Sequence, residues 1–482
     1  MENYSCNSVV RCIFIIIFVP FLLPTRNKDY PTNTDFIMAI APNEATPQVD
    51  LIYKIEDKPS FKDAVFAAFQ HLLAIFVAII TPPLIIAGAL DLDLETTSFL
   101  VSMALFASGV STFIQCRRVG PLGAGLLCVQ GTSFSFIGPI ISAGLAGGLP
   151  LIFGCTIAAA PVEMIVSRTF RYLKQIITPL VSGIVVLLIG LSLIKVGIIS
   201  CGGGNAAMSD GTFGNWQNLS IAALVLVSVL FFNKSKNKYI RMSSIVLGLL
   251  VGYVLAYILG RVDLSGMETT KIALLNIPVP FKYGLSLNLS SFIAIGLIYL
   301  ITAIEATGDI TANSMISGEP VEGDKYIKRV SGGVLADGFN SLLAGVFNSF
   351  PNSIFAQNNG LIQLTGVASR RVGYYIAAML IVLGLFPGIG LIFSLMPDPV
   401  LGGATLLMFG TVAAAGIRII AAQDIDRRAT MILAISLSLG LGVELMPDIL
   451  RNISLDLRGI FSSGITTGGL AAIISNMLIR GK

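Results

Sequence analysis

The polar segment at residues 357–366 reads QNNGLIQLTG and interrupts a strongly apolar part of the chain. An amide side chain in such surroundings has to be hydrogen-bonded to protein, to water or to a ligand. Close packing of helices explains the glycines of this segment but does not require consecutive amides. Gln357, Asn358 and Asn359 therefore indicate a ligand site, with an internal brace as the alternative.

Two acids, Glu305 and Asp309, lie four residues apart in another apolar segment, so they share one face of a helix. Ionisable groups inside a membrane segment are costly and point to the handling of a substrate or a proton. Burial favours the protonated form of a carboxyl group, which makes each acid a candidate proton carrier. The alternative for each is a structural acid bonded to backbone amides.

Other ionisable groups also fall in apolar segments. Asp337 either caps the N-terminus of a half-helix or takes part in proton coupling. His71, which follows Gln70, is expected to bridge two helices through a hydrogen bond, with proton carriage as the alternative. Glu163, two residues after Pro161, is expected to be structural.

A second polar stretch, QGTSFS, occupies residues 130–135. Such a sequence is hard to sustain as a full helix in lipid, and non-helical backbone at membrane depth occurs only inside protein or beside a water-filled cavity. We expect half-helices here and at residues 357–366, with short strands as the alternative. The free N–H groups and positive ends of two such half-helices could face one ligand.

The composition places these residues in a membrane protein. Of 482 residues, 54% are hydrophobic and 12% charged, whereas soluble domains carry about 25% charged residues. A net charge of +4 gives no reason to expect nucleic acid binding. One histidine and six scattered cysteines do not predict a metal site. The sequence shows neither a phosphate-binding loop nor a nucleophile–base pair, so it predicts neither a cofactor nor an enzyme.

Apolar segments of spanning length number about fourteen, which predicts an all-α polytopic fold. Their expected positions are 65–88, 97–115, 124–142, 149–167, 176–196, 217–233, 241–260, 289–314, 331–348, 355–366, 372–396, 399–419, 428–446 and 461–479. The third and tenth are the polar, broken ones.

Basic residues gather in every second loop, which predicts that these loops and both chain ends are cytoplasmic. They are Arg117, Arg118, Arg168, Arg171, Lys174, Lys234, Lys236, Lys238, Arg241, Lys325, Lys328, Arg329, Arg370, Arg371, Arg418, Arg427, Arg428, Arg480 and Lys482. Residues 1–60 are expected to form a disordered tail, and an alternative start at Met38 would make the first 37 residues an upstream extension.

An internal repeat links the two halves. Residues 179–183 (PLVSG) followed by Gly190 match residues 399–403 (PVLGG) followed by Gly410, with identical spacing. A unit of seven spans crosses the membrane an odd number of times, so its second copy is inverted. Inverted repeats with broken helices at corresponding positions are typical of secondary transporters.

From about Phe61 onward the chain resembles the nucleobase–ascorbate transporter family, also called nucleobase:cation symporter-2. The motifs that carry this resemblance are Gln70-His71, QGTSF at 130–134, Glu305 with Gly308-Asp309, Ala336-Asp337-Gly338, and Gln357-Asn358 with Gly360, Thr365 and Gly366. Glutamine at position 357 is similar to the xanthine and urate permeases, whereas uracil permeases typically have glutamate there. Gly366 and Ser135 fall at positions that vary among relatives, so xanthine and urate both stay open.

The resemblance implies fourteen spans in a seven-plus-seven inverted repeat. A core domain at 61–175 and 285–397 would bind substrate, and a gate domain at 176–260 and 398–482 would support a homodimer. The implied localisation is the cell membrane.

The function expected is proton-coupled import of an oxidised purine by alternating access, with sodium as the less favoured coupling ion. Glu305 and Gln357 would read the ring edge, Phe134 would stack on the ring, and Ser135, Asn358 and Gly360 complete the expected substrate site. The expected scaffold comprises Gly131, Thr132, Asn359, Thr365 and Gly366, and the expected proton-coupling or structural polar residues are Gln70, His71, Asp309 and Asp337. The alternatives are a uracil or other nucleobase permease, an anion transporter of the sulfate-permease type, and a sensor or channel.

Overall fold

The computed structural model describes residues 51–173, 178–237, 240–241, 243–262, 275–321, 323–421, 423–453, 461 and 463–479. The predicted tail at 1–60 falls mostly outside these residues. Its last ten residues differ from the expectation of disorder. The Ile52 backbone N–H donates to the Gly366 carbonyl at 2.8 Å, and that of Ala368 donates to the Tyr53 carbonyl at 2.8 Å. This part of the tail is therefore bonded to the chain that follows the polar segment.

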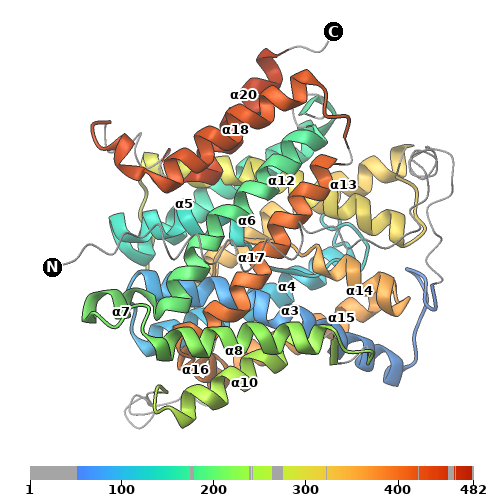
Figure 1. Cartoon of the computed structure of the whole chain (residues 1–482). Helices are drawn as coiled ribbons and strands as arrows, with labels where there is room; N and C mark the ends of the chain where they lie inside the picture. Colours follow the sequence, from blue (N-terminus) through green and yellow to red (C-terminus); the bar gives the residue numbers. More distant parts are fainter. Residues whose placement is uncertain are drawn as a thin grey trace, which may run out of the picture. The chain divides into compact units, whose positions relative to one another are not determined.

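The first half of the chain forms helices interrupted by one short strand (Figure 1). In order, the elements are α3 (Phe61–Ala89), α4 (Leu94–Arg117), β1 (Gln130–Thr132), η1 (Phe134–Phe136), α5 (Ile137–Leu173), α6 (Pro179–Gly202), α7 (Gly204–Asp210), α8 (Trp216–Asn233) and α10 (Ser244–Ile258).

The second half repeats this pattern of helices with one strand (Figure 1). Its elements are α12 (Leu289–Ile316), α13 (Gly323–Val346), β2 (Asn352–Ile354), α14 (Gln357–Thr365), α15 (Arg370–Leu385), α16 (Pro387–Ser394), α17 (Asp398–Ala421), α18 (Arg427–Leu445), η2 (Pro447–Leu450) and α20 (Gly464–Leu478).

Among the described residues, eight helices are long and apolar enough to cross a membrane, and α10 and α20 are shorter apolar helices. The chain is therefore a mostly helical, multi-pass membrane protein, as its sequence predicted. The fourteen crossings and the seven-plus-seven inverted repeat stay predictions.

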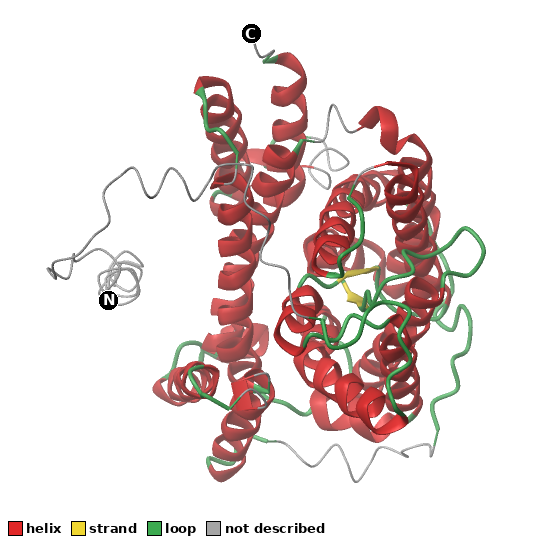
Figure 2. Cartoon of the chain, turned by 90° about the vertical axis from the view of Figure 1, so that its right-hand side faces the viewer, coloured by secondary structure: helices red, strands yellow, loops and turns green. Residues whose placement is uncertain are grey.

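The third expected segment is broken in the structure. Residues 118–129 form no helix, and β1 pairs antiparallel with β2, with Gln130 opposite Ile354 and Thr132 opposite Asn352. Figure 2 shows this strand pair enclosed by helices. A Cβ built on Gly131 would lie 2.6 Å from Phe355 Cζ, so only glycine fits at the centre of the pair. The alternative of short strands is thus the observed one.

The tenth expected segment, 355–366, directly follows β2 and contains α14, a helix of nine residues. At 1.5 Å per residue such a helix is about 14 Å long, roughly half the thickness of a bilayer core. It therefore matches the expectation of a half-helix. Gly366 ends it at a φ of 70°, a left-handed conformation that glycine adopts without strain.

The eleventh expected segment, 372–396, does not form one continuous helix. The structure divides it into α15 and α16 at Phe386, whose φ and ψ are −96° and 104°. Pro387 explains the division, because a proline disfavours helical backbone at the preceding residue and lacks an N–H donor.

The helices pack in two sets. Around the strand pair, α4 packs on α15, α5 packs on α12 and α13, and α3 packs on α4 and α15. We call this set the strand-pair set. In the other set, the glycine set, α6 packs on α17, α8 packs on α10 and α17, and α18 packs on α20. The polar residues singled out in the sequence belong mainly to the first set.

Candidate substrate site

An accessible polar surface lies where α12, α14 and η1 meet. Gln357 and Gly360 of α14 are exposed, and Glu305 and Asp309 of α12 are half-buried. A Cβ built on Gly360 would meet no described atom within 4 Å. At the beginning of α14, the Gln357 side chain and the backbone at Gly360 are therefore accessible.

Glu305 is held beside η1. Ser135 Oγ donates a hydrogen bond to Glu305 Oε2 at 3.4 Å, and Ser135 itself is buried. The remaining acceptor capacity of Glu305 points to a ligand with N–H donors, because charge-assisted hydrogen bonds are strong in a low-dielectric site. The structure thus brings together two of the expected substrate residues.

Phe134 forms the apolar side of this surface. Its ring is half-buried and meets the Phe409 ring of α17 edge to face, with 5.5 Å between the ring centroids. Phe409 belongs to the glycine set, so this contact joins the two helix sets next to Glu305. A flat ligand could stack on Phe134 from the open side.

Asn358 points away from the open surface and braces α14. Asn358 Nδ2 donates to the Leu127 carbonyl at 2.5 Å, and Asn358 Oδ1 lies 2.7 Å from His71 Nδ1. His71 is fully buried in α3, while its neighbour Gln70 is half-buried. The helix-to-helix hydrogen bond expected of His71 is present, and both groups of Asn358 are used internally.

Asn359 and Thr365 are also bonded within the protein. Asn359 Nδ2 donates to the Asp309 carbonyl at 3.1 Å, and Asn313 Nδ2 donates to Asn359 Oδ1 at 2.9 Å. Thr365 Oγ1 donates to the Leu361 carbonyl one turn earlier at 2.8 Å. These contacts tie α14 to α12 and suit the expected scaffold role.

Asp337 does not cap a helix, so that expectation is wrong. It lies in the interior of α13 and is fully buried, and Gln130 Nε2 of β1 donates a hydrogen bond to its Oδ1. Asn340, one turn later, donates through Nδ2 to Gln130 Oε1 at 2.5 Å. Asp337 therefore lies behind the strand pair rather than on the open surface. Thr132 of β1 is buried there as well.

Sequence reasoning missed several bracing amides. Gln115 Nε2 donates to the Gly333 carbonyl at 2.8 Å, and its Oε1 accepts from the Ala124 backbone N–H at 3.0 Å. Asn313 could have been found, because Glu305, Asp309 and Asn313 follow one another at four-residue spacing on one helix face. The position of Gln115 carries no comparable signal.

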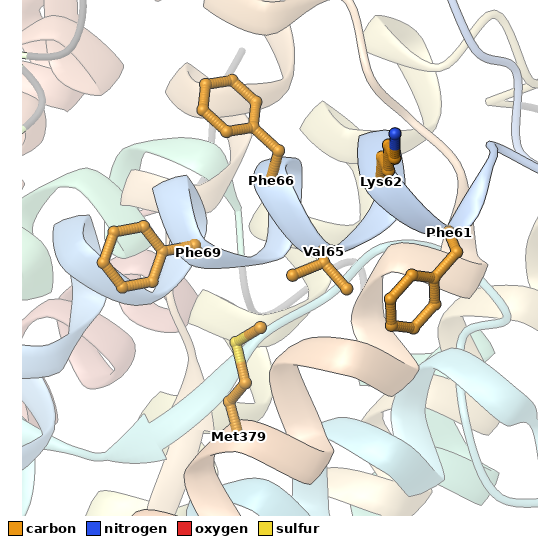
Figure 3. Close-up of a pocket in the computed structure, with 6 residues that line it drawn as sticks. All are labelled: Phe61, Lys62, Val65, Phe66, Phe69 and Met379. Carbon is orange, nitrogen blue, oxygen red and sulfur yellow. The ribbon is translucent and has the colours of Figure 1, made fainter.

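A separate apolar pocket of about 390 Å³ lies on α3 and α15 (Figure 3). It is lined by Phe61, Lys62, Val65, Phe66, Phe69 and Met379. Lys62 is the one polar side chain of this lining, so the pocket lacks the paired donors and acceptors that a polar planar ligand requires. The surface at Glu305 and Gln357 is the better candidate site.

The chain is similar to known permeases over most of its length. The model of the family described as "Permease family" matches residues 62–449. Xanthine permease XanP of Escherichia coli (strain K12) is 49% identical over 446 residues, which cover 91% of this chain and 96% of that protein. Uric acid permease PucJ of Bacillus subtilis (strain 168) is 34% identical over 425 residues, covering 87% of this chain and 93% of that protein.

A solved structure supports the fold. The transmembrane domain of a cyanobacterium bicarbonate transporter, BicA, superimposes with a TM-score of 0.51 at 13% identity, covering 88% of this chain and 100% of that chain. At this identity the likeness concerns the fold alone.

Proposed function

Since this chain belongs to the permease family, we propose that it imports an oxidised purine, xanthine or urate, by proton symport with alternating access. The family expected from the sequence is confirmed, and its named relatives are a xanthine permease and a uric acid permease. The chain is a purine transporter of the membrane, not an enzyme.

The observation that carries the proposal is a half-buried carboxylate and an exposed amide on two helices that pack together, Glu305 of α12 and Gln357 of α14. Oxidised purines are flat and carry N–H donors and carbonyl acceptors along their edges. Glu305 accepts from ring N–H groups, and Gln357, with a donor and an acceptor, reads an adjacent N–H and C=O pair. Phe134 stacks on the ring.

An anion transporter of the sulfate-permease type is the main rival reading, because a bicarbonate transporter shares the fold. A carboxylate at the site argues against this rival, since Glu305 repels an inorganic anion that brings no N–H donor, whereas xanthine and urate both offer ring N–H groups to it. A uracil permease is the other rival. Gln357 supports a purine, because the resemblance associates glutamate at this position with uracil.

The two helix sets supply the parts that alternating access requires. In the proposal, the strand-pair set is the core domain that holds the purine, and the glycine set is the gate domain that also forms a homodimer. Movement of the core against the gate exposes the site to each side of the cell membrane in turn. The contact between Phe134 and Phe409 lies at this boundary, and both chain ends are cytoplasmic.

Uptake of radiolabelled purine tests the proposal in a host that lacks its own permeases. We expect uptake of xanthine or urate, competition by the other, and weak competition by uracil and adenine. A protonophore should collapse accumulation. Uptake of uracil but not of xanthine or urate would contradict the purine assignment, and indifference to the protonophore would contradict proton coupling.

A further inference from the structure

A second group of polar side chains lies wholly inside the protein, behind the strand pair. Glu163 of α5 and Asp337 of α13 are both 0% exposed. A Cβ built on Gly338, the neighbour of Asp337, would lie 3.1 Å from the Glu163 Cβ. The two helices therefore approach closely at this point, and Asp337 is among the side chains that face the Glu163 carboxyl group.

Oxygen atoms in this group lack donors. Neither Glu163 oxygen nor Asp337 Oδ2 has a hydrogen-bond partner among the described residues. The same holds for Oδ1 of Asn340 and of Asn352, two buried amides whose N–H groups are bonded elsewhere in the strand-pair set. An unsatisfied buried acceptor is costly, so this excess of acceptors calls for a positive charge or a proton.

Among the described residues, the side chains that face Glu163 and Asp337 carry no positive charge. From α12, Thr302, Tyr299 and Glu305 lie near Glu163. From β1, Gln130 donates to Asp337 Oδ1. Neither Glu163 nor Asp337 forms an ion pair within the described ranges. Two adjacent carboxylates without a cation cannot both be ionised at low cost.

We propose that Glu163 and Asp337 share one exchangeable proton, and that this is the proton that moves with the purine. The inference rests on the proposed function. A hydronium ion on the outer side gives its proton to one of the two carboxylates and leaves as water, and the other carboxylate accepts the hydrogen bond of the new O–H group. After the core has moved, that O–H bond breaks and the proton passes to a water molecule on the inner side. Because the pair is costly when both carboxylates are ionised, this form lasts only until the next proton binds.

Strand β1 connects the shared proton to the substrate site. Gln130 donates to Asp337 at one end of the strand, and Phe134 and Ser135 follow two residues after the other end. Protonation of Asp337 would weaken the hydrogen bond that its Oδ1 accepts from Gln130. Because Gln130 begins β1, this change could shift the backbone that leads to Ser135. Glu305 stays free to bind the purine, which separates substrate binding from proton binding.

Purified protein in proteoliposomes tests the inference through Glu163→Gln, which keeps the size of the side chain but cannot exchange a proton. The wild type should accumulate xanthine about tenfold for each unit of imposed pH gradient if one proton accompanies each purine. In Glu163→Gln we expect accumulation to fall to about onefold, while xanthine exchange at equal pH stays within about threefold of the wild type. Glu95→Gln, the same change at an exposed position of α4, should behave as the wild type.

The outcomes separate the inference from the proposed function. Wild-type accumulation by Glu163→Gln would overturn the shared proton alone, and so would equal losses of exchange and accumulation. A wild type that moves no purine would overturn the proposed function, and the inference with it. If Glu163→Gln does not insert, Glu163→Asp decides, because its shorter side chain weakens the shared bond and should shift the pH dependence of accumulation by about one unit. An unchanged pH dependence would contradict the inference.

Discussion

Glycine contacts pack helices in both the strand-pair set and the glycine set, but the strand-pair set adds buried side-chain amides that bond its irregular backbone. In the strand-pair set, buried side-chain amides bond to backbone groups of other elements. Asn313 and Asn358, for example, both donate to the Leu127 carbonyl. In the glycine set, backbones approach directly, and a Cβ built on Gly190 of α6 would lie 2.3 Å from the Ala413 nitrogen of α17.

This difference has a physical reason. Irregular backbone in a membrane leaves polar groups that must be satisfied inside the protein, and side-chain amides do this between β1, α12 and α14. Regular helices satisfy their own backbones, so α6 and α17 need only close contact, which small residues allow. In the proposed function, the first set holds the substrate and the second is the part against which it moves.

The largest effect is expected from substitutions that remove the proposed ligand contacts of the strand-pair set. Glu305→Ala should lower xanthine or urate uptake by about two orders of magnitude, because a hydrogen bond to a charged group contributes about 1.5–3 kcal/mol. Gln357→Ala should lower uptake by about one order of magnitude, because each of its neutral hydrogen bonds contributes about 0.5–1.5 kcal/mol. Gln363→Ala, the same change at an exposed position of α14, should keep uptake near that of the wild type. Normal uptake by the first two variants at equal membrane abundance would refute the site.

Asn358→Ala separates bracing from ligand binding. It leaves the buried His71 Nδ1 without its partner, which should destabilise the protein by about 1–3 kcal/mol. Thermal unfolding of the purified variant measures this loss, and we expect the KM for uptake to stay within about threefold of the wild type because the side chain faces inward. A strongly raised KM with unchanged stability would instead make Asn358 a ligand.

Substitutions of Gly190 and Gly410, which occupy matching positions in the two sequence repeats, test the packing of the glycine set. Gly190→Ala brings a methyl group into the backbone of α17 and should cost about 1–3 kcal/mol of stability. A Cβ on Gly410 meets no described atom within 4 Å, so Gly410→Ala should be neutral or stabilise α17 by up to about 1 kcal/mol. Thermal midpoints of both variants check this contrast, and equal effects would contradict the close approach of α6 and α17.

The smallest effect concerns an ion cluster at the edge of the strand-pair set. Glu319 Oε2 lies 2.7 Å from Arg329 Nη2 and 2.7 Å from Lys325 Nζ. Burial acts to raise the pKa of Glu319, but hydrogen bonds and charges from Lys325 and Arg329 outweigh it, so this pKa lies below its usual value. The cluster should therefore stabilise the fold above the unfolded pKa of about 4.3 and lose that contribution as the pH falls through the lower folded pKa.

The pH dependence of thermal unfolding measures this contribution. The wild type should lose about 1 kcal/mol or less on acidification through this range, since side chains of the cluster are partly exposed. The Glu319→Gln variant should not show this loss of stability on acidification, because it has no carboxylate at position 319 to protonate. Glu56→Gln, which removes the acid of an exposed pair with Arg370, should change stability little at neutral pH. Identical pH curves for the wild type and Glu319→Gln would show that the cluster contributes nothing.

Much of the helical framework follows from the sequence, because membrane helices satisfy their own backbones and need only apolar length. The expected segment 217–233 differs from α8 by one residue at its start, and 428–446 differs from α18 by one residue at each end. The polar breaks were also predictable, since glycine with amides at 130–135 and 357–366 conflicts with a continuous helix in lipid. Pro387 could have indicated the break between α15 and α16, but the apolar run around it hid the break.

The sequence by itself determined the membrane class, the broken segments and the family, because hydropathy, amides and motif spacing are local properties. Only the tertiary structure decided which broken parts pair and which polar groups meet. It paired Gln130 with Ile354, which is 224 positions later in the sequence, turned Asn358 inward while leaving Gln357 exposed, and set Glu163 against Asp337. These outcomes depend on contacts between distant helices, whose energies no single segment of the chain contains.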